Sequence, residues 1–324
     1  MIIIKIEHED SIGVSVVVIT YNQSNYIRKA LDSILMQKVS FKYEILVGDD
    51  ASTDGTQEIL CEYAQKYPKL FKIVLRKENI GATKNIYELL CKANGRYLAT
   101  LEGDDYWTDE KKLQIQYEFM QENSKYIGCT HKFDIVDKSG SVIKNQKLNW
   151  IKQKGVFTIE DFDGITLPGQ LGTWFFKNIF KGNKYELIIG VHRLISDRTI
   201  MMILLFNGNF NLINKKMSSY RSFTEIDNSA KCTNMLYKNN VDRIKQEIDI
   251  TKKNEEIALV YFNKKFEFFN YRMQIFSDAI ILFFKHPCKN SLISVYEAFA
   301  YTNNKLKAIL YIPINLFRKL YYKF

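Results

Sequence analysis

Short apolar runs alternate with amphipathic stretches over the first hundred residues, and this alternation limits the possible folds more than any other feature. Val14–Ile19 and Tyr43–Val47 are rich in β-branched or aliphatic residues, as expected for strands buried on both faces. Lys72–Leu75 and Tyr97–Leu101 repeat the pattern. Strand and helix in this order predict a parallel sheet with right-handed crossovers, whose ligands lie beyond the carboxyl ends of the strands.

Apolar residues at helical spacing lie between these runs and predict three helices. The first has one apolar face, formed by Ile27, Ala30, Leu31, Ile34 and Leu35. Asp54 is the expected N-cap of the second helix, and Gly95 is the expected end of the third. Each helix is therefore expected to connect two parallel strands.

The regular alternation ends near residue 110. Strands are expected over residues 126–136 and 172–176, and a mostly apolar helix over residues 197–206. Beyond residue 228 nearly every segment has a helical pattern. We therefore expect an α/β domain at residues 1–227, with a mostly parallel, Rossmann-like sheet flanked by helices, and a helical C-terminal extension at residues 228–324.

The composition fits a folded soluble chain and excludes several classes of protein. The five cysteines include no Cys-x-x-Cys pair, so neither a disulfide framework nor a zinc site is expected, and a reducing cytoplasm fits best. Met1–Lys5 does not resemble a signal peptide, and no uncharged apolar stretch approaches the roughly 20 residues of a spanning helix. The net charge is +10, yet residues 1–125 carry −3. The basic back half favours an anionic partner or a lysine-rich solvated surface.

Polar residues follow three of the predicted strands at their carboxyl ends. Thr20-Tyr21-Asn22 follows the first, Gly48–Gly55 the second and Glu102–Asp105 the fourth. Asp49-Asp50 and Asp104-Asp105 are adjacent carboxylates, which repel each other unless a cation or hydrogen-bond donors compensate. Mg²⁺ or Mn²⁺ is the natural cation, because it takes oxygen ligands and also binds diphosphate. Each pair taken alone is also compatible with turn or cap chemistry.

Four motifs in this region resemble those of the family-2 glycosyltransferases, which share the GT-A fold, a Rossmann-like nucleotide-binding sheet. They are Val16–Asn22, Ile45–Thr56, Asn79–Asn85 and Gly95–Asp105. One motif would be a weak signal, but four in order across residues 14–107 are specific. The resemblance implies an inverting enzyme that moves a sugar from a nucleotide diphosphate, such as a UDP-sugar, to a hydroxyl of a glycan or lipid-linked acceptor in bacterial cell-envelope polysaccharide synthesis.

The resemblance also implies a set of donor-binding residues near the first two strands: Thr20, Tyr21, Asn22, Asp49, Asp50 and Ser52. Thr20 and Tyr21 are expected to line the nucleoside pocket. Asp49 is expected to hydrogen-bond the edge of the base, uracil in a UDP donor. Asp50 and Ser52 are expected to support that loop.

Further donor contacts are implied for Asn79, Lys84 and Arg221. The family usually has an arginine where this chain has Lys84, which can act as a point charge but not as a bidentate fork. Arg221 ends a later predicted strand and is a candidate for a diphosphate contact, with a surface salt bridge as the alternative. Trp174 could stack on a sugar ring, although a buried core position is the more common role.

Glu102-Gly103-Asp104-Asp105 stands in for the family's Asp-x-Asp metal motif, with Glu102 replacing the usual first aspartate. The resemblance implies that Glu102, Asp104 and Asp105 bind Mn²⁺ or Mg²⁺ and that Asp104 also contacts the donor. Such an ion stabilises the charge that develops on the departing diphosphate.

An inverting transfer also needs a base that accepts the proton of the acceptor hydroxyl. Asp197, at the start of the predicted helix 197–206, is the best match to the carboxylate that serves the family in this role. Asp197 is also in the position of a helix N-cap, and Asp161 and Asp163 are weaker candidates for the base.

The expected partners are a nucleotide-sugar donor and a glycan or lipid-linked acceptor, without nucleic acid. Ala308–Phe317 and the basic residues after it suit peripheral contact with the inner face of the cytoplasmic membrane; packing against the catalytic domain or in a homodimer explains the same faces. Two other functions stay open. A nucleotidyltransferase-like enzyme on a similar sheet would commonly carry a Gly-rich basic loop after the first strand, and a non-catalytic glycan-binding module leaves the paired carboxylates unexplained.

Overall fold

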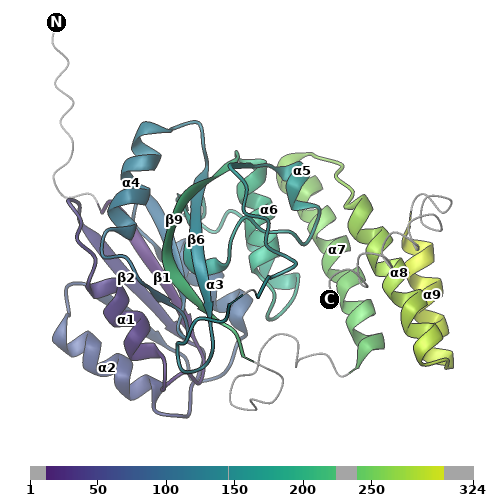
Figure 1. Ribbon diagram of the computed structural model, residues 1–324, viewed down its shortest axis with the longest axis horizontal. Helices are drawn as coiled ribbons and strands as arrows, with labels where there is room; N and C mark the ends of the chain where they lie inside the picture. Colours follow the sequence, from purple (N-terminus) through teal and green to yellow (C-terminus); the bar gives the residue numbers. More distant parts are fainter. Residues whose placement is uncertain (1–11, 145, 224–238, 303–324) are drawn as a thin grey trace, which may run out of the picture.

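The computed structural model describes residues 12–144, 146–223 and 239–302, and within them nine strands form one mixed sheet (Figure 1). Eight strands follow the order β3-β2-β1-β4-β8-β6-β9-β5, and β7 pairs with β9. The strands are β1 (Val14–Thr20), β2 (Tyr43–Asp49), β3 (Phe71–Leu75), β4 (Tyr97–Glu102), β5 (Tyr106–Trp107), β6 (Gly128–Val136), β7 (Val156–Phe157), β8 (Phe175–Lys177) and β9 (Phe210–Arg221).

The first four strands form the predicted parallel half of the sheet. β1 pairs in parallel with β2 and β4, and β2 pairs in parallel with β3. Each strand begins within one residue of its predicted start. Val16, Val17 and Val18 are at most 1% exposed, so the β-branched run of β1 is buried on both faces as predicted. The predicted GT-A-type α/β fold is confirmed.

The second half of the sheet is mixed. β8 is antiparallel to both β4 and β6, so β6 runs in the same direction as β4 and their carboxyl ends lie at the same edge. The strand predicted over residues 172–176 begins too early. Leu171–Thr173 instead forms a short 3-10 helix (η1), in which the side chain of Gln170 accepts a hydrogen bond from Gly172 N at 2.5 Å.

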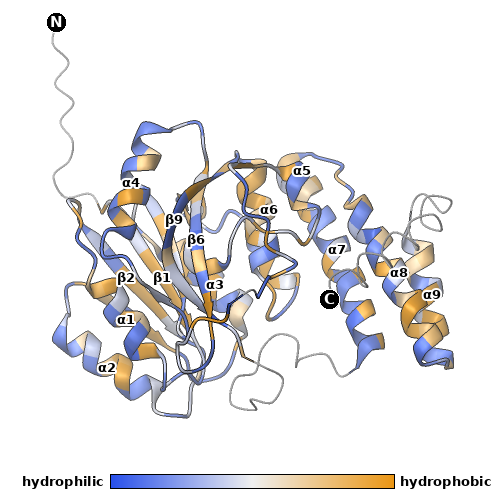
Figure 2. Ribbon diagram, in the orientation of Figure 1, coloured by the Kyte–Doolittle hydropathy of each residue, from blue (hydrophilic) through white to orange (hydrophobic). Residues whose placement is uncertain are grey.

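Helices cover both faces of the sheet, and Figure 2 shows apolar residues along the strands and mixed colours on the helices. α1 (Ile27–Leu35), α2 (Thr56–Lys66) and α4 (Lys112–Glu122) share an apolar core with Val16 and Val18. α3 (Ala82–Lys92) and α6 (Asp197–Phe206) share the opposite core with Val17. α5 (Ile159–Phe162) and a second 3-10 helix, η2 (Glu186–Gly190), complete this part. Alternate residues of β1 therefore face different cores.

Two predicted helix boundaries are wrong. Gly55, with φ of 96°, is the N-cap of α2, and Asp54 lies one residue earlier, where it accepts a hydrogen bond from Thr56 N at 3.1 Å. The C-cap of α3 is Ala93, not Gly95. A Cβ on Gly95 would come within 2.6 Å of the carbonyl carbon of Val14. Gly95 therefore permits close approach to β1 rather than ending the helix.

Three further helices follow the sheet: α7 (Asn240–Phe262), α8 (Phe269–Lys285) and α9 (Lys289–Tyr301) (Figure 1). Residues of α7 and α8 belong to the same apolar core as α3 and α6, so these helices pack directly on the α/β part. The domain boundary between residues 227 and 228 stays a prediction. The predicted membrane-contact segment, residues 308–323, lies outside the described residues, and no helix within them is long and apolar enough to cross a membrane.

Candidate active site

The carboxyl ends of β1, β2 and β4 lie side by side. In the strand register Thr20 is opposite Asp49, and Ile19 is opposite Glu102. The polar residues that follow these strands therefore surround one edge of the sheet, as parallel pairing requires. We call this edge the carboxyl rim; it consists of residues 20–24, 49–56 and 102–105.

Hydrogen bonds join the loop after β1 to the loop after β2. Asn22 N donates to Ser52 Oγ at 2.8 Å, and Asn22 Oδ1 accepts from Thr53 N at 2.9 Å. Ser24 N donates to Asp54 Oδ2 at 2.9 Å. The side chains of Asn22 and Ser52 thus hold the two loops together. Tyr21 is 39% exposed at the same place, and its ring is accessible to a base.

Asp49 and Asp50 are buried and accept hydrogen bonds from the protein itself. Asp49 Oδ1 accepts from Ser52 N at 2.9 Å and from Gln57 Nε2 at 2.6 Å, and Asp49 Oδ2 accepts from the Ser52 hydroxyl. The Asp50 carboxylate accepts a hydrogen bond from Gly81 N at 2.9 Å and another from the backbone N–H of the residue before Gly81 at 2.8 Å. Hydrogen-bond donors therefore compensate this pair, which agrees with the turn-chemistry alternative. A contact from Asp49 to the base stays a prediction.

Asn79 lies beside this loop and is tied to the segment that precedes α6. Its Nδ2 donates to Asp50 O at 3.1 Å, and its Oδ1 accepts from Arg193 Nη2 at 2.6 Å. Thr83 N donates to Arg193 O at 3.0 Å. Lys84 lies in the first turn of α3 and is half-buried; no residue within the described ranges forms an ion pair with it, and its contact with the donor stays a prediction.

Ala51, between Asp50 and Ser52, adopts a left-handed backbone conformation with φ of 65°. Glycine tolerates this conformation without the steric penalty of a Cβ, so we expect Ala51→Gly to raise the free energy of unfolding by about 0.5–1 kcal/mol. Chemical denaturation followed by circular dichroism measures the change. Ala64→Gly, within α2, is the matched control and should be destabilising by a similar amount. A loss of stability in Ala51→Gly would contradict the assigned conformation.

The acidic turn Glu102–Asp105 packs against the end of β1. A Cβ on Gly103 would come within 2.8 Å of Thr20 Oγ1, so glycine permits this close packing. Gln23 connects the two segments: its Oε1 accepts from Thr20 Oγ1 at 2.8 Å, and its side chain hydrogen-bonds Asp104. The position of Asp104 therefore depends on the loop after β1.

Burial and mutual repulsion raise the pKa values of the acidic residues in this turn. The pKa of Glu102 is raised to about 8, first by burial and then by the charges of Asp104 and Asp197. Burial raises the pKa of Asp104 to about 6. Burial, followed by the neighbouring carboxylates, also raises the pKa of Asp105 well above its ordinary value. The turn therefore concentrates negative charge that the protein compensates only in part.

Arg221 ends β9 as predicted, but it is only 4% exposed, so it is not a surface salt bridge. Its Nε donates to Asp104 O at 2.9 Å, and its Nη1 donates to the carbonyls of Asp137 and Lys138 at 2.8 and 2.7 Å. Its guanidinium carbon lies 4.5 Å from the ring centroid of Tyr26. These contacts hold the acidic turn in place, and a diphosphate contact stays a prediction.

Asp197 is the first residue of α6 and lies within electrostatic range of the acidic turn. Its charge contributes to the raised pKa of Glu102, so the two carboxylates lie close enough to interact. The N-cap of α6 is Ser196, not Asp197, and Asp197 Oδ1 accepts a hydrogen bond from Arg198 N at 2.8 Å. Burial raises the pKa of Asp197, and the Arg198 cation opposes this effect. A buried carboxylate with a raised pKa is suited to accept a proton.

Two other sequence candidates have structural roles. Trp174 is fully buried and donates from Nε1 to Gly169 O at 2.8 Å, so it is a core residue and not a sugar platform. Although burial raises the pKa of Asp161, ion pairs with Lys154 and Lys152 lower it to about 2. A carboxylate held in this way is a poor general base.

The acidic turn fits the predicted divalent ion in its chemistry. Asp105 Oδ2 is buried without a hydrogen-bond partner among the described residues, and a cation would relieve the repulsion at Glu102 and Asp104. Within the described ranges no three His, Cys, Asp or Glu residues form a ready-made metal cluster. Mg²⁺ is commonly held by one or two carboxylates together with substrate phosphates. Glu102, Asp104 and Asp105 fit a site of that kind, completed by the donor, and their role as ligands stays a prediction.

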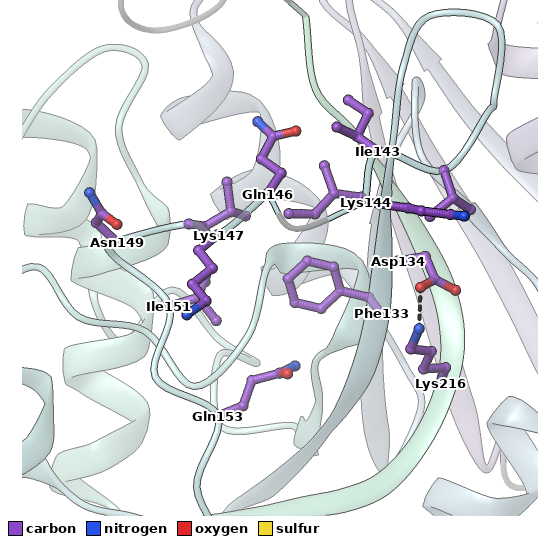
Figure 3. A pocket seen from close by; sticks show the side chains of 13 residues that line it. Phe133, Asp134, Ile143, Lys144, Gln146, Lys147, Asn149, Ile151, Gln153 and Lys216 are labelled. Atoms are coloured by element: carbon purple, nitrogen blue, oxygen red, sulfur yellow. Dashed lines mark hydrogen bonds and ion pairs between the residues drawn. The ribbon is translucent and has the colours of Figure 1, made fainter. Parts of the chain in front are cut away.

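A cavity of about 600 Å³ lies between β6 and the loop that follows it (Figure 3). The ring of Phe133 points into it, and the Asp134–Lys216 ion pair lies on its strand side. Gln146 on its wall donates to Ser222 Oγ at 3.2 Å, next to Arg221. Because β6 and β4 run in the same direction, this cavity lies toward the same edge of the sheet as the carboxyl rim. A second cavity of about 410 Å³ adjoins Ser52 and Gln57.

No role was predicted for Gln23, Gln57 or Arg193, although all three contact predicted site residues. Gln23 directly follows Thr20–Asn22, and this position next to a predicted donor-binding motif is the sequence feature that could have indicated its role. Gln57 lies on a helix, and Arg193 lies more than a hundred residues from Asn79 along the chain. No local pattern marks either residue.

A sheet of this topology, with polar loops and an acidic turn at its carboxyl edge, has the GT-A fold. Residues 15–181, just over half of the chain, match the sequence model of Glycosyl transferase family 2, and the chain belongs to this family. Asp197 and Arg221 lie beyond the matched segment.

Relatives and solved structures support this assignment. An uncharacterised protein of Mycobacterium tuberculosis is 44% identical over 127 residues, 39% of this chain and 37% of that protein. Bacillus subtilis TuaG, assigned as a teichuronic acid biosynthesis glycosyltransferase, is 40% identical over 111 residues, 34% of this chain and 43% of its own. The chain thus spans about two fifths of the length of these curated relatives. The structure of S. aureus TarS residues 1–349 in complex with UDP-GlcNAc has the same fold, with a TM-score of 0.59 at 17% identity over 89% of this chain and 80% of that 1–349 chain.

Proposed function

We propose that the protein transfers a sugar, a hexosyl or N-acetylhexosaminyl group, from a UDP-sugar to a hydroxyl of a glycan or lipid-linked acceptor, with inversion at the sugar carbon. The proposal depends on one observation: the acidic turn at the carboxyl rim interacts electrostatically with Asp197. The UDP-GlcNAc complex of TarS supports a UDP donor. The assignment of TuaG to teichuronic acid biosynthesis supports a cell-surface glycan as the product.

The donor would bind at the carboxyl rim. The exposed ring of Tyr21 offers a face for stacking on the base. Asp49 and Asp50 fix the loop backbone around the nucleoside through the hydrogen bonds described above. Lys84, half-buried beside this loop, would attract the diphosphate as a point charge.

Glu102, Asp104 and Asp105 would hold a Mn²⁺ or Mg²⁺ ion together with the donor diphosphate. When bound, such an ion neutralises charge that develops on the leaving nucleoside diphosphate. Arg221 keeps Asp104 in position through its hydrogen bond to the carbonyl of that residue. Gln23 fixes the same side chain from the loop after β1.

Asp197 would act as the general base. It accepts the proton of the acceptor hydroxyl while the acceptor oxygen forms a bond to the anomeric carbon, and the bond from that carbon to the diphosphate oxygen breaks. The nucleoside diphosphate leaves with the bonding electrons, and attack from the opposite side inverts the configuration. The cavity in Figure 3 lies toward the same edge of the sheet and is the site that we assign to the acceptor.

Titration calorimetry of UDP and GDP, with and without Mn²⁺, tests the donor assignment. We expect UDP to bind more tightly than GDP and to require Mn²⁺ for full affinity, because the acidic turn repels a diphosphate that lacks a cation. Incubation with a UDP-sugar and an acceptor should release UDP. Pyrophosphate released from UTP and a sugar phosphate would instead indicate a nucleotidyltransferase, and glycan binding without any nucleotide binding would indicate a binding module.

A further inference from the structure

Two buried clusters, each with an arginine, a glutamate and a tyrosine, stabilise the C-terminal helices. In the inner cluster, Arg198 Nη1 donates to Glu247 Oε2 at 2.7 Å and to Tyr271 Oη at 3.1 Å. The Tyr271 hydroxyl donates to the same glutamate oxygen at 2.5 Å. Arg198 comes from α6, Glu247 from α7 and Tyr271 from α8. The inner cluster therefore joins three helices at the residue that follows Asp197.

The outer cluster has the same chemistry in a different place. Arg272 Nη2 and Nε donate to Glu255 Oε2 and Oε1 at 2.5 and 2.9 Å, and the Tyr301 hydroxyl donates to Glu255 Oε2 at 3.1 Å. Its members lie on α7, α8 and α9, and none of these three hydrogen bonds involves α6. The outer cluster is thus a natural internal control for the inner one.

The inner cluster determines where the cation next to Asp197 lies. Asp197 interacts with Arg198 and Glu247, and it faces Glu102 from the sheet. Because Glu247 and Tyr271 hold the Arg198 guanidinium, the cation is directed toward α7 and α8. Without Glu247, the neighbouring counter-charge for Arg198 would be Asp197 itself, and an ion pair between them would occupy the carboxylate.

A second contact fixes the same turn of α6. Thr199 Oγ1 donates to Asn254 Oδ1 at 2.8 Å, and both residues are buried. The start of α6 is therefore attached to α7 at two consecutive residues, Arg198 and Thr199. Asp197 also interacts electrostatically with Glu102, at the end of β4.

We infer that Glu247 and Tyr271 are positioning residues for sugar transfer: they engage Arg198 so that the Asp197 carboxylate stays free for the acceptor hydroxyl. This inference rests on the proposed role of Asp197 as the base. It assigns to the C-terminal helices a part in the reaction, in addition to their part in the core.

The full-length Glu247→Gln variant, with Glu255→Gln as the control, tests the inference. Both substitutions remove the charge from a buried cluster on α7, so both should lower the thermal midpoint. We expect Glu247→Gln alone to lower kcat by about 10- to 100-fold, the range expected when a reacting group is misplaced by about 1 Å, while the KM and the calorimetric affinity for the UDP-sugar stay unchanged. Tyr271→Phe, controlled by Tyr301→Phe, removes only a hydroxyl and serves if Glu247→Gln does not fold.

Coupling to Asp197 separates positioning from a general structural effect. In an Asp197→Asn background, Glu247→Gln should cause no further loss of the residual transfer, because the carboxylate that it positions is gone. If Asp197→Asn is inactive but Glu247→Gln and Tyr271→Phe match their controls in kcat, the inference is wrong and the base assignment survives. Full activity of Asp197→Asn would overturn the base assignment itself.

Discussion

The Asp197→Asn variant is expected to lose about 10²- to 10⁴-fold in kcat for sugar transfer while its affinity for the nucleotide-sugar donor stays at the wild-type value. The amide has nearly the same shape as the carboxylate, but it cannot accept the proton of the acceptor hydroxyl. Asp197 is not the N-cap of α6, and the Oδ1 of an asparagine can still accept the hydrogen bond from Arg198 N, so the substitution should not disturb the start of α6. Steady-state kinetics and donor titration on the same protein measure the two effects.

Asp161→Asn is the matched control for this variant, since Asp161 was a weaker candidate for the base. Its carboxylate is held by Lys152 and Lys154. The control should keep its kcat. Wild-type turnover in Asp197→Asn, or an equal loss in both variants, would show that the base lies elsewhere.

The second large effect is expected for Asp104→Ala. The Mn²⁺-dependent part of its UDP affinity should fall by about 100-fold. Substitution of residues that only hydrogen-bond a metal ligand already lowers metal affinity by about 10- to 100-fold, and Asp104 is assigned as a ligand itself. Removing this carboxylate leaves Glu102 and Asp105 as the other assigned ligands. In the wild type, the apparent Mn²⁺ affinity should decrease as the pH falls through 8 and again through 6, because the pKa values of Glu102 and Asp104 are raised, chiefly by burial, to about 8 and about 6 and protons then compete with the metal. Calorimetry at several pH values measures both effects.

Asp134→Asn is a suitable control for Asp104→Ala, because Asp134 pairs with Lys216 beside the 600 Å³ cavity and not at the carboxyl rim. Its UDP and Mn²⁺ affinities should equal those of the wild type. The assigned metal site would be rejected if UDP bound equally well without Mn²⁺ and if Asp104→Ala left that binding intact.

The parallel half of the sheet could be predicted from the sequence because its signal is local. Buried strands need uninterrupted apolar residues, and Val16–Val18 satisfies that need on both faces. Boundaries that depend on distant contacts were predicted less well. Gly95 resembles a helix end, yet it is required where the chain crosses β1. Leu171–Thr173 has strand-like neighbours but is bent by the side chain of Gln170.

The candidate site was predictable to the extent that it lies at strand ends. Parallel pairing brings Thr20, Asp49 and Glu102 to one edge, so the sequence order of these motifs already implies their proximity. The orientation of side chains was not predictable in this way. The Asp49 carboxylate accepts hydrogen bonds from Ser52 and Gln57. The Arg221 guanidinium donates to main-chain carbonyls. Both sets of hydrogen bonds depend on how the loops pack.

The sequence by itself determined the parallel half of the sheet, the residues at its carboxyl edge and the family, because strand periodicity and motif order are properties of neighbouring residues. Only the tertiary structure decided which carboxylates are compensated by hydrogen bonds and which keep their repulsion. It also decided that Glu247 and Tyr271, from the C-terminal helices, hold the cation beside Asp197. The physical reason is that charge compensation depends on distance in space, and these partners are about 50 to 75 positions from Arg198 in the chain.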